Sequence, residues 1–396
     1  YRQKIISKLI DLKLSIRSLK KSNNENYYDF EISDIVSRKI DKNINLIDKS
    51  LNSKIVLVTG AGGSIGNELC QQIAFANPQQ LIILDHSEYF LFEIYKKLEK
   101  ISLNKEIKFE IIPIVASIND KKRIYNIFEK YSPAIIFHSA AYKHVHLMEN
   151  NHYSVIKNNI FGSINIIDAS VKYNVENFVL ISTDKAVRPT SIMGRTKRIS
   201  EMYLQAIQEK TNAQNLKTKF SIVRFGNVLG SSGSVIPIFK NQIILGGPVK
   251  VTDSNVNRFF MLIPEASNLV LQTLFLSKGG DIFILNMGEP FKIKDLAEKM
   301  IRLNGFLPTY NKPLNPLEIQ IVFTGLTKGE KLYEELLIGN NPITTQNPDI
   351  FKTFENFPNL DKINIFLNNV QERITKNDLH LIDSIIIDFI KNNDIS

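Results

Sequence analysis

The fold of this 396-residue chain is decided by the stretch Ile55-Val56-Leu57-Val58-Thr59-Gly60-Ala61-Gly62-Gly63-Ser64-Ile65-Gly66. Its first four residues form an apolar run typical of a fully buried strand. The glycines that follow let the backbone turn tightly and approach a pyrophosphate at the positive end of the next helix. The stretch therefore predicts a strand, a turn and a helix that bind a dinucleotide through Gly60, Gly63, Ser64, Ile65 and Gly66.

Further apolar runs continue the pattern in both halves of the segment that ends near residue 225. They predict strands at 81–84, 111–115, 135–137, 178–181 and 221–223, with helical patterns between them, such as 195–209. Strands that alternate with helices form a parallel sheet covered on both faces. We predict an α/β fold with a Rossmann-type doubly wound parallel sheet.

Changes in composition divide the chain into four parts. Residues 1–50 hold a basic amphipathic helix and a linker, which pack on a neighbour or lie on a membrane. Residues 51–225 form the dinucleotide-binding domain. Short pieces rich in Gly, Pro and Asn at 226–345 predict a smaller C-terminal α/β lobe, to which a family resemblance assigns substrate binding. Residues 346–396 predict helices that close the fold.

The bulk composition excludes several classes of protein. With 43% hydrophobic and 22% charged residues, the chain resembles an ordinary globular protein. Its one cysteine, Cys70, forms no disulfide framework and suits a buried position. The net charge of +9 is spread along the chain, so we expect no nucleic-acid partner. No run reaches about 18 apolar residues, and the chain begins at Tyr1, so we expect a trimmed product.

Residues at the ends of the second and fourth strands favour one cofactor. Asp85 follows Gly66 by 19 residues, and a carboxylate there accepts hydrogen bonds from a ribose 2′-hydroxyl and repels a 2′-phosphate. This predicts NAD. Small residues after the fourth strand, Ala140 and Ala141, would let the cofactor lie flat. We expect His138 to be a packed residue and predict no metal site.

The fifth strand leads into Ser182-Thr183-Asp184-Lys185, followed by Met193 and Lys197. The spacing resembles the Ser and Tyr-x-x-x-Lys arrangement of the extended short-chain dehydrogenase/reductase family. Here Met193 occupies the tyrosine position and cannot carry a proton. Because Asp184 and Lys185 place an acid beside a base, the sequence points to a reaction other than plain oxidation.

A longer resemblance, from about residue 30 to the end, is to bacterial UDP-N-acetylglucosamine 4,6-dehydratases. It is carried by Thr183-Asp184-Lys185-Ala186, Arg224-Phe225-Gly226-Asn227-Val228-Leu229-Gly230-Ser231, Arg258-Phe259-Phe260-Met261, Ile263-Pro264-Glu265-Ala266 and Gly329-Glu330-Lys331-Leu332-Tyr333-Glu334-Glu335-Leu336. The exchange of Met for Tyr resembles the subgroup that serves protein glycosylation through a bacillosamine intermediate.

The resemblance implies a mechanism. NAD would take a hydride from C4, Lys185 would remove the C5 proton, Asp184 would protonate the leaving C6 hydroxyl, and the hydride would return to C6. Thr183 would hydrogen-bond the sugar near O4, Lys197 would bind the nicotinamide ribose, and Ser182 would contact the cofactor. A water near Lys197 or Asp184 itself could replace the missing tyrosine as the C4 base.

The resemblance also implies contacts for substrate and adenine. The substrate-binding residues would be Lys143, His144, Asn227, Ser234, Arg258, Glu330 and Lys331. In place of the family's usual acidic residue, Ser117 would accept from adenine. Expected partners are UDP-N-acetylglucosamine and further copies of the chain. A membrane anchor ahead of Tyr1 would place these residues on the cytoplasmic side of the inner membrane.

Two other functions compete with this prediction. A nucleotide-sugar 4-epimerase would also use bound NAD, but it has no use for the Asp184–Lys185 pair and depends on the missing tyrosine. A non-catalytic NAD-binding regulator would explain the loss of the tyrosine but not the presence of Asp184, Lys185 and Lys197.

Overall fold

The computed structural model describes residues 49–103, 109–231, 233–338, 342–376, 378 and 381–393. These residues fall into two compact units. We call 49–225, Pro264–Asn286 and 335–393 the sheet unit, and Gly226–Ile263 and Met287–Glu334 the small unit. The amphipathic helix and linker predicted at 1–50 lie outside the described residues, except for Lys49 and Ser50.

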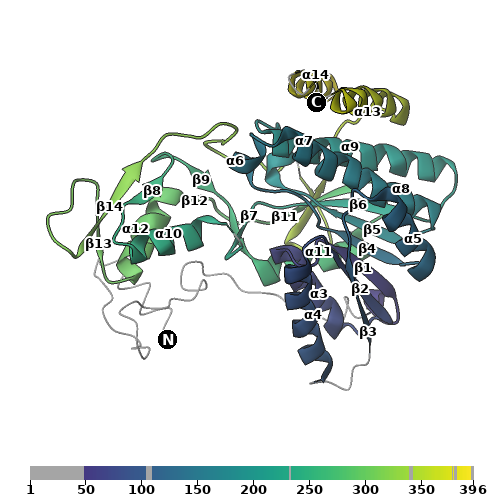
Figure 1. Ribbon diagram of the computed structural model, residues 1–396, viewed down its shortest axis with the longest axis horizontal. Helices are drawn as coiled ribbons and strands as arrows, with labels where there is room; N and C mark the ends of the chain where they lie inside the picture. The colour runs from purple at the N-terminus through teal and green to yellow at the C-terminus, as the bar shows by residue number, and fades with distance from the viewer. Residues whose placement is uncertain are drawn as a thin grey trace. The chain divides into compact units, whose positions relative to one another are not determined.

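A nine-stranded sheet forms the centre of the sheet unit (Figure 1). All six predicted strands are confirmed, and they run parallel in the order β3-β2-β1-β4-β5-β6. Their bounds are Ile55–Thr59 (β1), Gln80–Asp85 (β2), Glu110–Val115 (β3), Ile135–His138 (β4), Asn177–Ile181 (β5) and Lys219–Arg224 (β6). This is the strand order of dinucleotide-binding sheets.

Three further strands extend this sheet beyond β6. Strand β11 (Asp281–Leu285) pairs parallel to β6, β16 (Ile350–Thr353) pairs antiparallel to β11, and β15 (Ile343–Thr344) pairs antiparallel to β16. The division of the chain thus differs from the expected boundary at 226–345, because Pro264–Asn286 returns to the sheet unit. All five residues of β11 are buried, since the strand lies between two others.

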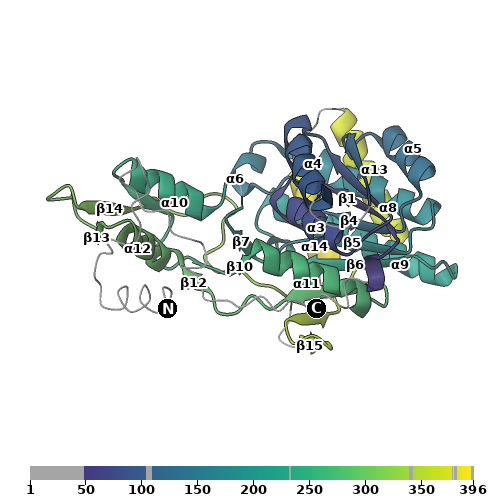
Figure 2. The ribbon, with the colours of Figure 1, turned by 90° about the horizontal axis from the view of Figure 1, so that it is seen from below.

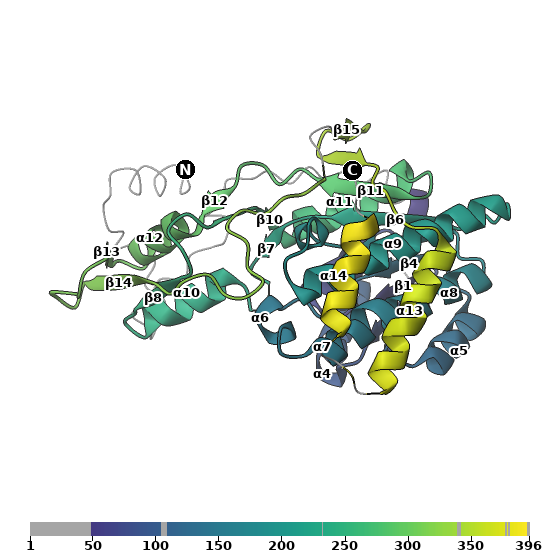
Figure 3. The ribbon, with the colours of Figure 1, turned by 90° about the horizontal axis from the view of Figure 1, so that it is seen from above.

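Helices cover both faces of the sheet, which confirms the doubly wound fold. One face carries α3 (Ser64–Phe75), α4 (Glu88–Leu103) and α11 (Ile263–Leu276) (Figure 2). The other carries α5 (Lys121–Tyr131), α8 (Ser163–Lys172) and α9 (Ile192–Ala213), and α13 (Leu360–Thr375) and α14 (Ile382–Asn393) pack outside α9 (Figure 3). Short helices α6 (Val145–Met148) and α7 (His152–Val155) lead into a π-helical segment, Ile156–Gly162, ahead of α8.

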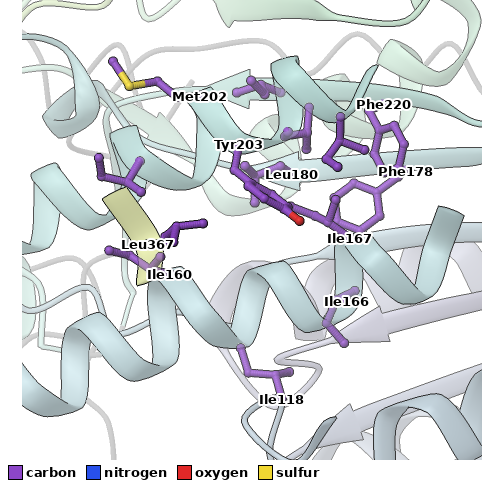
Figure 4. Packing of buried hydrophobic residues seen from close by; sticks show 14 of the residues in the cluster. Ile118, Ile160, Ile166, Ile167, Phe178, Leu180, Met202, Tyr203, Phe220 and Leu367 are labelled. Carbon is purple, nitrogen blue, oxygen red and sulfur yellow. The ribbon is translucent and has the colours of Figure 1, made fainter. Parts of the chain in front are cut away.

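Aromatic and branched side chains fill the space between the sheet and α8 and α9 (Figure 4). Phe178 of β5 and Phe220 of β6 lie side by side, with ring centroids 5.3 Å apart. Ile166 and Ile167 of α8 and Tyr203 of α9 pack in the same cluster. This core fixes the strands whose carboxyl ends carry the predicted chemistry.

The small unit is a separate arrangement of strands and helices. Strand β7 (Asn227–Leu229) pairs with β10 (Phe260–Leu262), β9 (Asn257–Arg258) with β12 (Phe291–Lys292), and β14 (Glu318–Phe323) with both β13 (Leu307–Thr309) and β8 (Val249–Val251). Helices α10 (Val235–Ile244) and α12 (Ile293–Leu303) complete it. It has its own core, which includes Phe239, Ile243, Val249, Met300 and Ile321.

Candidate active site

The glycine turn between β1 and α3 has the geometry that its sequence predicts. Gly60 adopts a φ of +66°, and a Cβ added there would lie 2.7 Å from the backbone nitrogen of Ala140. A Cβ on Gly66 would lie 2.1 Å from the Gly60 carbonyl oxygen. Side chains at these positions would therefore push apart β1, the β4 loop and the first turn of α3. The turn therefore leaves backbone N–H groups accessible at the start of a 12-residue helix, an arrangement that can bind a pyrophosphate.

Asp85 ends β2 and supports the same turn. Its Oδ2 accepts a hydrogen bond from the Gly62 backbone N–H at 2.9 Å, and its Oδ1 accepts from the Ser87 N–H at 2.9 Å. Gly62 is needed here because a Cβ would meet the Cβ of Phe90 at 2.4 Å. His86 Nδ1 also lies 3.3 Å from Oδ1, so the second lone pair of Oδ2 is the acceptor that a ribose hydroxyl can use.

His138 is the packed, hydrogen-bonded residue that the sequence predicted. Its Nδ1 lies 2.7 Å from Thr59 Oγ1 and its Nε2 lies 2.9 Å from Ser163 Oγ, with no part of the residue exposed. Burial, together with the charge of Lys197, lowers the pKa of His138 to about 3, so its ring is neutral at physiological pH. The imidazole thus ties β1 to α8 beneath Ala140.

The turn after β5 gathers the predicted catalytic residues. Residues Asp184–Ala186 form a 3₁₀ turn, in which Thr183 Oγ1 donates to Asp184 Oδ1 at 2.8 Å and Lys185 Nζ donates to the same oxygen at 3.0 Å. The Asp184 side chain is fully buried, and its other oxygen, Oδ2, has no hydrogen-bond partner. A buried carboxylate oxygen without a donor is costly unless a bound molecule supplies one.

Helix α9 brings Met193 and Lys197 to the same strand end. Met193 is buried in the first turn of α9, and Lys197 Nζ donates to the Ile181 carbonyl oxygen at 2.7 Å. Burial lowers the pKa of Lys197 to about 8. The neighbouring Gly194 lets α9 contact the catalytic turn, because a Cβ there would lie 2.2 Å from the Lys185 carbonyl oxygen.

Asn159 is a functional candidate that the sequence analysis missed. It is fully buried in the π-helical segment, and its Nδ2 donates to the Tyr142 carbonyl at 3.0 Å and to Thr196 Oγ1 at 3.1 Å. Its Oδ1 accepts from the Tyr142 N–H at 2.9 Å. Asn159 therefore joins the β4 loop to α9 beside Lys197. Its direct neighbours Lys157 and Asn158 are polar too, so no local signal singles out Asn159.

Ser182 has a partner inside the protein. Its Oγ donates to Glu201 Oε1 at 2.6 Å, and its lone pairs stay available for the predicted cofactor contact. Burial would raise the pKa of Glu201, but the charges and hydrogen bonds of Arg224, with help from Arg198 and Ser182, lower it instead. Adjacent residues in an extended segment point to opposite sides, so Ser182 and Thr183 have separate environments.

Residues of the sheet unit predicted to contact adenine or substrate lie on loops after β3 and β4. Ser117 is half-buried, and its Oγ accepts from the Asn119 N–H at 3.2 Å. Lys143 and His144 remain exposed, although burial by the surrounding loop lowers the pKa of both side chains. His144 directly precedes α6 as its cap residue.

The remaining predicted substrate residues belong to the small unit. Arg258 is buried, and its guanidinium donates to Glu330 Oε1 at 2.9 Å and to the main-chain oxygen of Asn257 at 2.7 Å. These internal hydrogen bonds hold the guanidinium in place. Ser234 precedes α10 with a buried hydroxyl that has no partner. Asn227 begins β7, and Lys331 follows Glu330 on a half-buried segment.

Comparisons with known proteins identify the class. The model of the family described as "Polysaccharide biosynthesis protein" matches residues 56–355, and the chain belongs to this family. The chain is 45% identical over 336 residues to the capsular polysaccharide biosynthesis protein CapD of Staphylococcus aureus, covering 85% of the chain and 52% of that protein. The chain thus spans about half the length of this relative.

Two further relatives carry names that describe an activity. A UDP-N-acetylglucosamine 4,6-dehydratase (inverting) of Campylobacter jejuni is 30% identical over 309 residues, 77% of the chain and 82% of the relative. A UDP-glucose 4-epimerase of Rickettsia canadensis is 31% identical over 289 residues, 72% of the chain and 77% of the relative. Both classes that the sequence suggested therefore occur among similar proteins.

Solved structures share the fold. Pen from Bacillus thuringiensis has a TM-score of 0.65 and 30% identity, covering 78% of this chain and 90% of its own. DesIV, a dTDP-glucose 4,6-dehydratase from Streptomyces venezuelae, has a TM-score of 0.58 and 19% identity, covering 71% and 87%. The DesIV structure contains NAD, the cofactor that Asp85 predicted for this chain.

Proposed function

We propose that the chain binds NAD and catalyses the 4,6-dehydration of UDP-N-acetylglucosamine. One observation carries the proposal. In the turn after β5, the buried Asp184 has one oxygen bonded to Thr183 and Lys185 and the other oxygen without a donor. Such an oxygen can accept a hydrogen bond from a sugar hydroxyl. In that position it could exchange a proton with the hydroxyl.

The residues around β1 and β2 fit NAD. Gly60 and Gly66 keep the turn tight, because a Cβ at either position would clash with neighbouring backbone, and Asp85 can accept a ribose 2′-hydroxyl. When bound, NAD would take a hydride from C4 of the sugar and return it to C6. Lys197 would contact the nicotinamide ribose, and its ammonium would favour loss of the C4 hydroxyl proton.

Asp184 and Lys185 would carry out the elimination. A ketone at C4 acidifies the C5 proton. The neutral amine of Lys185 would take that proton and give one back to C5 when the hydride adds at C6. Protonated Asp184 would give its proton to the C6 hydroxyl, which leaves as water, while Thr183 holds the sugar near O4. General acid and base catalysis each contribute about 10²–10⁴-fold.

Met193 occupies the position of the tyrosine and cannot take the C4 hydroxyl proton, so another residue must act as the base. Asp184 is our candidate. Its free oxygen would take the C4 hydroxyl proton while NAD accepts the hydride. The same proton would then serve the C6 hydroxyl, so that Asp184 returns to its ionised state within one turnover. Asn227 and Arg258 of the small unit stay predicted ligands of the diphosphate.

The test is incubation of the purified protein with UDP-N-acetylglucosamine, followed by mass spectrometry and NMR of the product. The proposal predicts loss of one water and a 4-keto-6-deoxy sugar, whereas a 4-epimerase would give an isomer of unchanged mass. No change in the sugar, with NAD still bound, would favour the regulator. The product's use in bacillosamine synthesis and a membrane anchor ahead of Tyr1 stay predictions. None of the described helices is long and apolar enough to cross a bilayer.

A further inference from the structure

Four buried charged side chains lie together behind the ends of β5 and β6, and the proposed reaction uses none of them. Arg198 and Glu201 come from α9, Arg224 ends β6, and Glu355 lies in the segment after β16. Three of these side chains are fully buried and that of Glu355 is 3% exposed. We call these residues the four-charge cluster.

The four-charge cluster is paired internally. Arg224 binds Glu201 through Nε and Nη2, at 2.9 and 2.6 Å, and binds Glu355 through Nη1 and Nη2, at 2.5 and 2.7 Å. Arg198 Nη1 lies 3.1 Å from Glu355 and 3.3 Å from Glu201. Two cations thus offset two anions, which is the condition for keeping such charges in the interior.

One bond connects this cluster to the catalytic turn. Glu201 Oε1 accepts from Ser182 Oγ at 2.6 Å, and Ser182 directly precedes Thr183. The backbone N–H groups of Ser182 and Asp184 donate to the carbonyl oxygens of Val223 and Phe225, at 2.8 and 3.1 Å, on either side of Arg224. The same arginine that binds Glu201 therefore sits on the strand that supports the turn.

We propose that Glu201 is a positioning residue for the catalytic turn, acting through the hydroxyl of Ser182. The four-charge cluster fixes the Glu201 carboxylate, and the carboxylate fixes Ser182, so Thr183, Asp184 and Lys185 start from a defined backbone position. This inference rests on the proposed function. It predicts that the Ser182 bond matters for turnover even though every ion pair survives without it.

The experiment compares Ser182→Ala, Glu201→Gln and the double variant in kcat and KM for UDP-N-acetylglucosamine. Small displacements of catalytic groups cost up to about 100-fold in rate, and we expect Ser182→Ala to lower kcat at least about tenfold with KM within about twofold. The amide oxygen of Glu201→Gln can still accept from Ser182, so this variant tests the charge of the carboxylate, and the double variant should be no faster than Ser182→Ala alone. If Glu201→Gln does not fold, Ser182→Ala still decides the question.

Tyr203→Phe is the matched control. Tyr203 lies on the same helix, and its hydroxyl donates to Asp168 Oδ1 at the same 2.6 Å as in the Ser182–Glu201 bond, but it is not connected to the turn. Its loss should leave kcat near wild type. A Ser182→Ala variant with wild-type kcat, or one that loses no more activity than Tyr203→Phe, overturns the inference.

Amide hydrogen exchange separates this inference from the proposed function. In Ser182→Ala, amides of 182–187 should exchange faster while those of β1 and β4 stay unchanged, whatever reaction the protein catalyses. Unchanged exchange in 182–187 contradicts the positioning role. A wild-type protein that does not dehydrate the sugar, yet shows faster exchange in the variant, refutes the proposed function alone.

Discussion

Two fully buried carboxylates, Asp184 and Glu201, lie near the same strand ends but differ in how many of their oxygens accept hydrogen bonds. Both oxygens of Glu201 accept hydrogen bonds, from Ser182 and from Arg224. Asp184 accepts from Thr183 and Lys185 through one oxygen only, and its Oδ2 has no partner.

The difference in hydrogen bonding separates a carboxylate with a structural role, Glu201, from one proposed to act in catalysis, Asp184. A buried group left unsatisfied costs about 1–3 kcal/mol, so the fold is less stable with Asp184 as it stands than with a complete set of donors. That cost is acceptable where a substrate hydroxyl completes the set. The saturated Glu201 instead holds its neighbours in place, and we expect its removal to act on stability first.

The largest effect should come from Asp184→Asn. The amide has the size of the carboxylate but cannot deliver a proton to the C6 oxygen, so kcat should fall by about 10²–10⁴-fold. Binding of NAD and UDP-sugar, measured by calorimetry, should change little. An active Asp184→Asn variant would mean that the open carboxylate oxygen is not the acid.

Glu355→Gln should lower the free energy of unfolding more than it lowers kcat, the reverse of Asp184→Asn. The change leaves two buried arginines facing Glu201 alone, and loss of one partner from a buried pair costs about 3–5 kcal/mol. Urea unfolding measures this loss. Glu372→Gln is the control, because Glu372 pairs with Lys376 on the exposed surface of α13 and its loss should not shift the urea midpoint.

The pH dependence of kcat tests the proposed role of Lys197. Because burial lowers its pKa to about 8, the ammonium predominates below that pH and the neutral amine above it. The proposed role needs the ammonium, so kcat should fall as the pH rises through about 8 and reach a slope of about tenfold per unit. The Lys197→Met variant should be slow and lack this limb. If kcat of the wild-type protein does not change with pH across this range, the Lys197 ammonium does not take part in the reaction.

Met193→Ala should have the smallest effect. Met193 is buried but cannot exchange a proton, so the variant should lose less than about tenfold in kcat, from packing near the catalytic turn. Steady-state kinetics at a temperature well below unfolding measures this. A loss as large as that of Asp184→Asn would assign the thioether a chemical role.

The sequence predicted the six parallel strands and the glycine turn because buried parallel strands are apolar runs and the turn requires glycine. It also predicted that His138 is a packed residue at a strand end. Strand β11 was missed, although Asp281–Leu285 is an apolar run of the same kind, because it follows the change in composition near residue 226.

The rest depends on contacts between distant residues. Glu355 lies 131 residues from Arg224, so no local pattern reveals that they pair. The partner of Ser182 depends in the same way on where α9 packs against β5. Likewise, the internal bond between Arg258 and Glu330 joins residues 72 apart. Candidate residues can be named from the sequence, whereas the partners that the structure gives them cannot.

The most direct test of the Asp184–Lys185 pair is deuterium incorporation at C5 in heavy water, with the wild-type protein and Lys185→Met. Elimination through C5 predicts one solvent deuterium at C5 of the wild-type product, detected by NMR. Lys185→Met should still bind UDP-sugar and NAD but show no exchange at C5. Incorporation at near wild-type rates in Lys185→Met would contradict the account and leave Asp184–Lys185 as a structural ion pair.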